Sequence, residues 1–567
     1  MKIRFVSSQL KLFFLNICML AAFNSANAQD LQLIIASSNT QETKAINRIG
    51  YSKSFENYKT LLLEIERFKN VAYRLGYIEA TVQSTTKNNL ETSVQLILGP
   101  KYESVQLYAD KVLFELLDIK PIETTDSLTY YQAKVSGLEV LMNQLTNSLA
   151  SKSYPFASVT LKNIKPISKS ILKADLIVVT KKARQLNTVE VKGYDKFPRS
   201  FIKHFLGIKT NTPFDLKAIQ TKTETLDQLN FTKQLRPAEV LFTQDTTSVY
   251  LYLQKNKSNR FDGFIGFGSE ETTGDLELNG YLYLNLVNNL NYGETFILNY
   301  RSDENDLKTF ETKLTLPYLF KSPIGSELKL NIFKKDSMFT TAEQSVNLFY
   351  QLNPKQRLFL GIQTAQSNAL DPIESSNIVD YKINAYELRY TYQNRTPKDI
   401  LFPLKTQMEV RFSRATRKTS TATTNQSIYL VKASRQFNLN TSNSIYIALD
   451  AQGIDSKNYL FNELLRFGGI RTIRGFEENS INASAFIVVA SEYRFRLSPS
   501  LYVHSIIDAA YFNTPTKIDQ KLVGIGFGFG VATEAGLLRF NIANGQVENQ
   551  NFRFSDSKVH LSLTATF

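Results

Sequence analysis

The sequence predicts small α+β modules followed by an antiparallel β-barrel that spans a membrane. Apolar residues recur in mixed helical and strand patterns up to about residue 257, and strict alternation takes over from residue 258. No apolar run after the first 28 residues approaches the ~18–20 residues that a transmembrane helix needs. Residues 258–567 hold sixteen strands of ~10 residues with their connections, although fourteen or eighteen strands also fit.

Residues 1–28 have the organisation of a secretory signal peptide. An apolar run, Leu12–Phe23, is followed by Ala26-Asn27-Ala28, which has the A-x-A pattern of a cleavage site. The run is too short to cross a bilayer as a helix. We expect cleavage before Gln29 and export of the rest of the chain; a buried N-terminal helix is the alternative. Three basic residues precede the run: Lys2, Arg4 and Lys11.

The scarcity of cysteine and histidine excludes several kinds of chemistry. Cys18, in the predicted signal peptide, is the only cysteine, so we expect no disulfide, thiolate catalysis or cysteine metal site. The three histidines lie far apart, without metal-ligand spacing. We therefore expect no catalytic residue, metal or cofactor. The net charge of +14 is spread along the chain, so we interpret it as surface charge towards anionic lipid rather than a nucleic-acid site.

Three similar units precede the predicted barrel, at residues 29–100, 101–184 and 185–257. Each reads as a strand, one or more helices and two further strands, a pattern typical of a small sheet with helices on one face. The longest helices are expected over residues 55–77, 130–152 and 214–230. Each of these ends near an aromatic residue that precedes a strand: Tyr77, Phe156 and Phe231.

This order of elements resembles POTRA domains, the periplasmic modules of outer-membrane assembly and translocation proteins. The third unit matches best and the second least, because Ser153 stands where the first unit has Gly76. Three unrelated α+β modules are the alternative.

The last ten residues, KVHLSLTATF, alternate cleanly between apolar and polar positions and stop on an aromatic. Bacterial outer-membrane barrels commonly end in this way, because the terminal strand closes the barrel and carries an assembly signal. We assign that signal to Leu561, Leu563 and Phe567. An edge strand of a soluble domain is the alternative.

The segment GIGFGFGV, Gly524–Val531, has glycine at every second position. It is not a nucleotide-binding loop, because G-x-G-x-x-G spacing is missing. On a strand, its apolar side chains would face lipid, and its glycines would leave room inside the barrel for something bulky.

The segment RFGGIRTIRGFEENS, residues 466–480, resembles the signature loop of the BamA/TamA superfamily. The resemblance rests on FGG followed by IRGF, at a suitable distance from the last residue. Early pieces of the barrel, NYGETFILNYRS and LPYLF, also look like barrel strands of that family. We expect a sixth extracellular loop that folds into the lumen, with these motif residues: Gly468, Gly469, Ile473, Arg474, Gly475 and Phe476.

The resemblance implies that Arg474 meets an acidic residue on the inner wall, since an unpaired buried charge is costly. We favour Asp508 and keep Glu492 as the second candidate. The family's Phe-x-Asp-x-Gly strand reads Ile506–Ala510 here, so only the acid is retained. A solvated surface loop is the alternative for the arginines, above all for Arg466 and Arg471.

The resemblance implies an outer-membrane protein that aids assembly or translocation of client chains, closest to TamA-like members. Its partners would be unfolded outer-membrane or exported proteins, outer-membrane lipid and accessory subunits. A dedicated secretion pore for one partner protein and a non-catalytic surface antigen are the alternatives. A lipase or protease barrel is disfavoured, because no G-x-S-x-G motif occurs.

Overall fold

A computed structural model describes residues 30–123, 129–269, 276–302, 307–335, 337–370, 378–396, 399–517, 519–533, 536–548, 553 and 557–564. The predicted signal peptide therefore lies outside the described residues. No described helix is long and apolar enough to cross a membrane. The chain divides into two compact units, residues 1–184 with 213–215 and residues 185–212 with 216–567, and each is described by itself.

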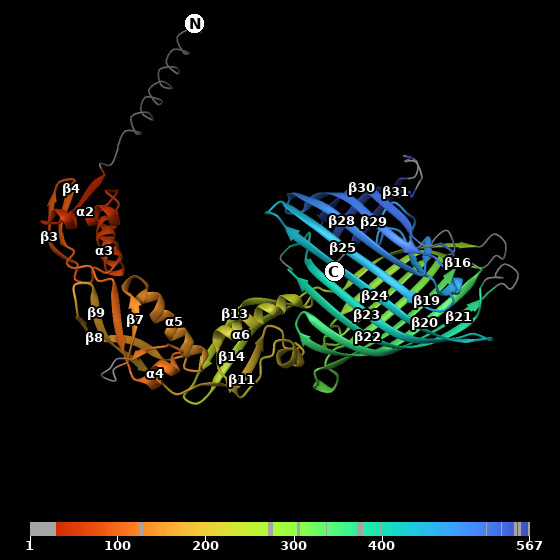
Figure 1. The fold of residues 1–567 in the computed structure, drawn as a ribbon, viewed down its shortest axis with the longest axis horizontal. Coiled ribbons are helices and arrows are strands. Elements are labelled where there is room, and N and C mark those ends of the chain that lie inside the picture. The colour runs from red at the N-terminus through yellow and green to blue at the C-terminus, as the bar shows by residue number, and fades with distance from the viewer. Residues whose placement is uncertain are drawn as a thin grey trace, which may run out of the picture. The chain divides into compact units, whose positions relative to one another are not determined.

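The first module is a four-stranded sheet with two helices (Figure 1). The strand order is β2-β1-β4-β3, and β1 pairs with β4 in parallel. The elements are β1 (Leu31–Ala36), α2 (Thr40–Ile49), β2 (Ser54–Phe55), α3 (Tyr58–Arg74), β3 (Thr81–Asn88) and β4 (Glu91–Ile97).

Helix α3 holds this module together by burying one face on the sheet. Leu61, Phe68 and Ala72 recur at helical spacing and are fully buried. Asn57 begins the helix, because its side chain accepts the backbone N–H of Thr60 at 3.0 Å. The sequence pattern misses α2, since Ile46 is its only buried residue and a nearly all-polar helix gives no apolar stripe.

The second module is a five-stranded sheet in the order β6-β7-β5-β9-β8. The single helix expected over residues 130–152 is wrong in its first third, where β7 forms. Gly137 interrupts the helical pattern, and Tyr130 and Tyr131 suit a strand. The elements are β5 (Ser104–Tyr108), α4 (Lys111–Leu116), β6 (Ile122–Glu123), β7 (Thr129–Lys134), α5 (Leu138–Ser151), β8 (Ser158–Pro166) and β9 (Ile171–Val179).

The third module has a three-stranded sheet in the order β11-β14-β13, with a separate pair formed by β10 and β12. Its core strand is β14, on which Val249, Leu251 and Leu253 are fully buried. The elements are β10 (Gln185–Leu186), β11 (Thr188–Lys192), a π-helical turn (Phe201–Phe205), β12 (Thr212–Pro213), α6 (Leu216–Glu224), a 3-10 turn (Thr225–Gln228), β13 (Thr232–Phe242) and β14 (Thr247–Lys255).

Sixteen antiparallel strands follow and curl into a barrel, as the sequence predicts (Figure 1). Neighbours in sequence pair with each other, except that β25 pairs with β28 across a long loop. The strands are β15 (Arg260–Ser269), β16 (Leu276–Val287), β17 (Thr295–Ser302), β18 (Leu307–Leu316), β19 (Ile324–Lys335), β20 (Phe339–Asn353), β21 (Gln356–Ala369), β22 (Tyr381–Arg395), β23 (Leu404–Lys418), β24 (Thr423–Asn438), β25 (Asn443–Asp455), β28 (Ala485–Ser498), β29 (Leu501–Asn513), β30 (Gln520–Thr533), β31 (Gly536–Val547) and β32 (Ser557–Thr564).

Strand β21 shows how the barrel wall separates its two faces. Leu358, Leu360 and Ile362 face outward and are exposed, with Leu360 at 67%. Between them, Phe359 is buried on the inner face, and Gln363 lines an inner cavity. An apolar outside and a polar or filled inside are what a lipid-facing barrel requires.

The third module contacts the barrel through the connections at one end of the strands. Phe201 packs edge-on against Tyr318 at 4.8 Å between ring centroids, and Gly293 lies so close that a Cβ there would be 2.2 Å from the Phe201 ring. Asn288 donates to the Tyr194 hydroxyl at 2.6 Å. Aromatic packing and a buried hydrogen bond therefore join the module to two barrel turns.

A third connection is held by polar groups. Gln228 Nε2 donates to the Arg395 carbonyl at 2.8 Å, and the Arg395 N–H donates to Gln228 Oε1 at 3.0 Å. LPYLF, expected as part of a barrel strand, belongs to one of the turns instead: Leu316 ends β18, and Tyr318 and Phe320 have positive φ angles of 54° and 52°. Left-handed residues cannot continue a strand, which explains the difference.

Candidate functional site: a loop locked inside the barrel

The segment between β25 and β28 folds back into the barrel as a hairpin. Two short strands, β26 (Leu465–Phe467) and β27 (Ile481–Ala483), pair with each other and form its stem. The odd-numbered strands from β15 to β25 run away from the module end, so this loop begins at the opposite end of the barrel. Residues 468–480 form its tip.

The stem and tip are fixed to the wall by apolar packing. Phe467 is fully buried. Its ring stacks on that of Phe486, with 4.5 Å between ring centroids, and meets the ring of Phe512 edge-on at 5.3 Å. Ile473 of the motif is also fully buried in this cluster, and Phe476 packs against it. The other buried members are Ala483, Val488, Ala510 and Leu522.

Gly475 brings the tip into direct contact with the backbone of β31. Its φ angle is +91°, and a Cβ at this position would lie 2.4 Å from the Gly545 nitrogen. Only glycine fits such a left-handed conformation at such a short distance. The other motif glycines, Gly468 and Gly469, also have positive φ angles, 120° and 89°.

Arg474 lies beside Gly475 and binds both candidate acids. Its backbone N–H and Nε donate to Asp508 Oδ2 at 3.0 and 2.7 Å, and its Nη2 donates to Oδ1 at 2.5 Å. Its Nη1 donates to Glu492 Oε1. All three side chains are buried, and Asp508 is completely so. We call this group the Arg474 lock.

Two further buried residues extend the lock, and sequence reasoning missed both. Arg494 Nε donates to Glu492 Oε2 at 2.7 Å, and its guanidinium lies over the Tyr446 ring at 3.9 Å. His504 Nδ1 lies 3.8 Å from Glu492 Oε2. Arg494 could have been found, because it is two residues from Glu492 on the same strand and shares its inner face.

The charges of the lock balance. Arg474 and Arg494 carry two positive charges, and Asp508 and Glu492 carry two negative charges. The bidentate contact to Asp508 is the geometry in which a buried guanidinium binds a carboxylate most strongly. A balanced, hydrogen-bonded group can stay buried, whereas removal of one member leaves an uncompensated charge.

One of the alternating glycines of β30, Gly524, makes room for the loop tip. Phe527 faces outward and is 63% exposed. On the inner side, a Cβ at Gly524 would lie 2.3 Å from the carbonyl oxygen of Arg474. At Gly524 the bulky group expected inside the barrel is therefore the loop itself. At the other three glycines of the run, the nearest atoms belong to neighbouring strands: Ile542, Asn541 and Tyr502.

Solved structures with a similar fold include BamA and CdiB. The crystal structure of BamA from Haemophilus ducreyi lacking POTRA domains 1–3 has a TM-score of 0.50 and 14% identity; the match covers 83% of this chain and 100% of that one. CdiB from Escherichia coli has a TM-score of 0.51 and 13% identity, with 94% and 99% covered. CdiB from Acinetobacter baumannii has a TM-score of 0.51 and 12% identity, with 82% and 90% covered.

The chain has the fold of BamA and CdiB. No protein-family model and no curated protein matches the sequence. The likeness is therefore visible in the structure rather than in overall sequence identity. Modules and barrel both take part in it, since the match to CdiB from Escherichia coli spans nearly the whole chain.

The other predicted site residues are placed as follows. Leu561 lies on the last strand, β32, and is exposed on the outer face. The backbone of Leu563 belongs to β32 as well, while Phe567 lies outside the described residues. Arg471 is exposed at the loop tip, as expected for a solvated arginine. Among the residues that the structure describes, no cluster has the composition of a metal site.

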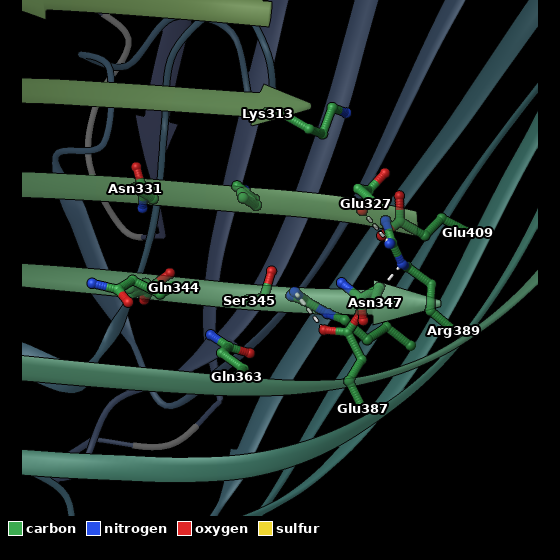
Figure 2. A pocket seen from close by; sticks show the side chains of 13 residues that line it. Lys313, Glu327, Asn331, Gln344, Ser345, Asn347, Gln363, Glu387, Arg389 and Glu409 are labelled. Atoms are coloured by element: carbon green, nitrogen blue, oxygen red, sulfur yellow. Dashed lines mark hydrogen bonds and ion pairs between the residues drawn. The ribbon is translucent and has the colours of Figure 1, made fainter. Parts of the chain in front are cut away.

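The inner wall of the barrel also forms a polar cavity of about 170 Å³ over β18–β23 (Figure 2). Arg389 lines this cavity, where it is ion-paired with Glu327 and lies 3.2 Å from Glu387. Four cations and four carboxylates line the cavity: Lys313, Lys329, Arg389, Arg411, Glu327, Glu343, Glu387 and Glu409. Such a wall suits water and polar chains, not an apolar ligand.

Gly475→Ala is expected to lower the free energy of unfolding by about 1–3 kcal/mol, because the new methyl group overlaps the β31 backbone. Urea titration of the purified protein in lipid vesicles measures this. Gly453→Ala is the matched control, since a Cβ there meets only the Ala485 methyl group at 3.5 Å. Equal losses in the two variants would contradict the proposed contact.

Proposed function

We propose that this protein is an outer-membrane assembly or translocation factor, with its modules in the periplasm. The observation that carries the proposal is the match to BamA and CdiB over both modules and barrel. The Arg474 lock supports it, because its residues were expected from the same superfamily and lie together. No catalytic step enters the proposal.

The modules offer a way to receive clients. β3, β8 and β13 each lie at the edge of their sheet. An edge strand presents unpaired backbone groups, so an extended segment of an unfolded protein can add to it as a further strand. We propose that unfolded outer-membrane or exported proteins bind here, with accessory subunits and membrane lipid as further partners.

The number of modules supports the assembly of several clients rather than the export of one. Dedicated secretion pores of this kind usually carry two modules and a plug helix. Here three modules precede the barrel, and the described residues between 258 and 564 form no α-helix. We therefore favour a specialised assembly factor of the TamA type. A secretion pore remains the second candidate, because CdiB structures match as well as BamA does.

Depletion of the protein followed by outer-membrane proteomics tests the proposal. We expect the levels of several outer-membrane proteins to fall together while the inner-membrane proteome stays constant. The loss of a single exported protein would instead support the secretion pore. An unchanged outer-membrane and secreted proteome would contradict both, and would leave the surface antigen.

A further inference from the structure

The first arm of the loop, residues 458–467, is held by a second buried arginine. Arg417, on β23, is 1% exposed. Its Nη1 binds Glu463 and donates to the Asn458 carbonyl at 3.3 Å, and its Nη2 binds the Asn458 side chain. Glu463 also accepts Gln426 Nε2 at 3.0 Å. We call this group the Arg417 clamp.

The arm covers the ends of several more strands beside the clamp. Asn462 Nδ2 donates to the Ser367 hydroxyl on β21 at 2.8 Å, and the Tyr381 hydroxyl on β22 donates to the Asn462 carbonyl at 3.3 Å. Arg466 lies over the rings of Phe333 on β19 and Phe339 on β20, at 4.3 and 5.1 Å. One short segment thus contacts six neighbouring strands, β19–β24.

The Arg417 clamp and the Arg474 lock bind different parts of the wall. The clamp uses β23 and β24, whereas the lock uses β28 and β29, and no residue is shared. Each contains its own buried carboxylate and its own guanidinium. Breaking one therefore leaves the charges of the other balanced.

We propose that the arm is a lid, which the Arg417 clamp holds over the end of the barrel away from the modules. The lid closes the mouth over β19–β24 and is released separately from the Arg474 lock. Without Arg417, the Glu463 carboxylate would be buried without a cation, which is costly. Opening of the lid then lowers the free energy, because it returns this carboxylate to water. That this end of the barrel is the extracellular one rests on the proposed function. The contacts of the Arg417 clamp do not depend on it.

A cysteine under the lid reports its position. Ser367 is fully buried beneath Asn462. In a Cys18→Ser background, Ser367→Cys carries the only thiol of the chain. We expect a water-soluble maleimide to label purified full-length Ser367→Cys slowly, and to label it about tenfold faster or more when Arg417→Ala is added. An unchanged rate would overturn the proposal.

Three variants sharpen this result. Arg414→Ala removes an exposed arginine from the other face of the same strand and should leave labelling slow. Arg474→Ala should also leave it slow; labelling as fast as with Arg417→Ala would mean that lid and lock move as one, which overturns the proposal. Heat-modifiable gel mobility shows that each barrel is folded. If the Arg417→Ala barrel is not folded, Glu463→Gln is labelled instead. We expect the same rise in the labelling rate, and an unchanged rate would overturn the proposal. No client is needed, so failure here is separate from failure of the proposed function.

Discussion

Arg474→Ala is expected to lower the free energy of unfolding by about 3–5 kcal/mol and to abolish complementation of a depleted strain. The substitution removes three side-chain hydrogen bonds to Asp508 and Glu492, while alanine retains the backbone N–H that donates to Asp508. It leaves two buried carboxylates with Arg494 as their cation. Urea titration in lipid vesicles measures the stability, and growth after depletion measures the function.

Two controls separate the charge from the packing. Arg471→Ala removes the exposed arginine of the same tip and should complement fully. Asp508→Asn added to Arg474→Ala leaves one carboxylate, Glu492, for one guanidinium, Arg494. This double variant should therefore be more stable than Arg474→Ala alone. Additive losses in the double variant would refute the charge-balance argument.

Phe467→Ala is expected to cost about 3–5 kcal/mol, because it opens a cavity in the apolar cluster beneath the loop stem. The ring is fully buried between Phe486 and Phe512. The same urea titration measures the loss. Because the tip then loses its apolar base, trypsin should also cleave after the exposed Arg471 faster than in the parent protein.

Phe412→Ala is the matched control for this cavity. Its ring faces outward on β23 and is 41% exposed. The substitution removes the same group without opening a cavity in the barrel, so it should cost less and leave the trypsin rate unchanged. A loss as large as that of Phe467→Ala would show that the cluster adds nothing beyond ordinary ring burial.

The architecture could be predicted because it depends on local periodicity. Alternation predicts strands wherever one face is lipid and the other is polar, as on β22 and β29, where buried and exposed residues alternate. Ser153 stands in the second module where the first module has Gly76, and this difference also has a local reason. Its φ angle is +76°, so it adopts the left-handed conformation that Gly76 has in the first module, at 103°. A serine in that position hides the turn from a search for glycine.

The lock could be predicted only in part, because it joins residues far apart in the chain. The resemblance to the signature loop identified Arg474, and the resemblance of two downstream strands to those of the same superfamily identified Asp508 and Glu492 as candidates. The structure binds both to Arg474 rather than one. Arg417 and Glu463 are 46 residues apart and carry no motif, so nothing in the sequence links them before the loop is folded.

The polar cavity of the barrel has a consequence for permeation. Its four cations and four carboxylates are equal in number, so their charges cancel at a distance beyond the ~10 Å over which charges act in dilute salt. The wall therefore gives little preference for anions or cations. Selectivity between solutes at this part of the barrel must come from the width left open by the loop.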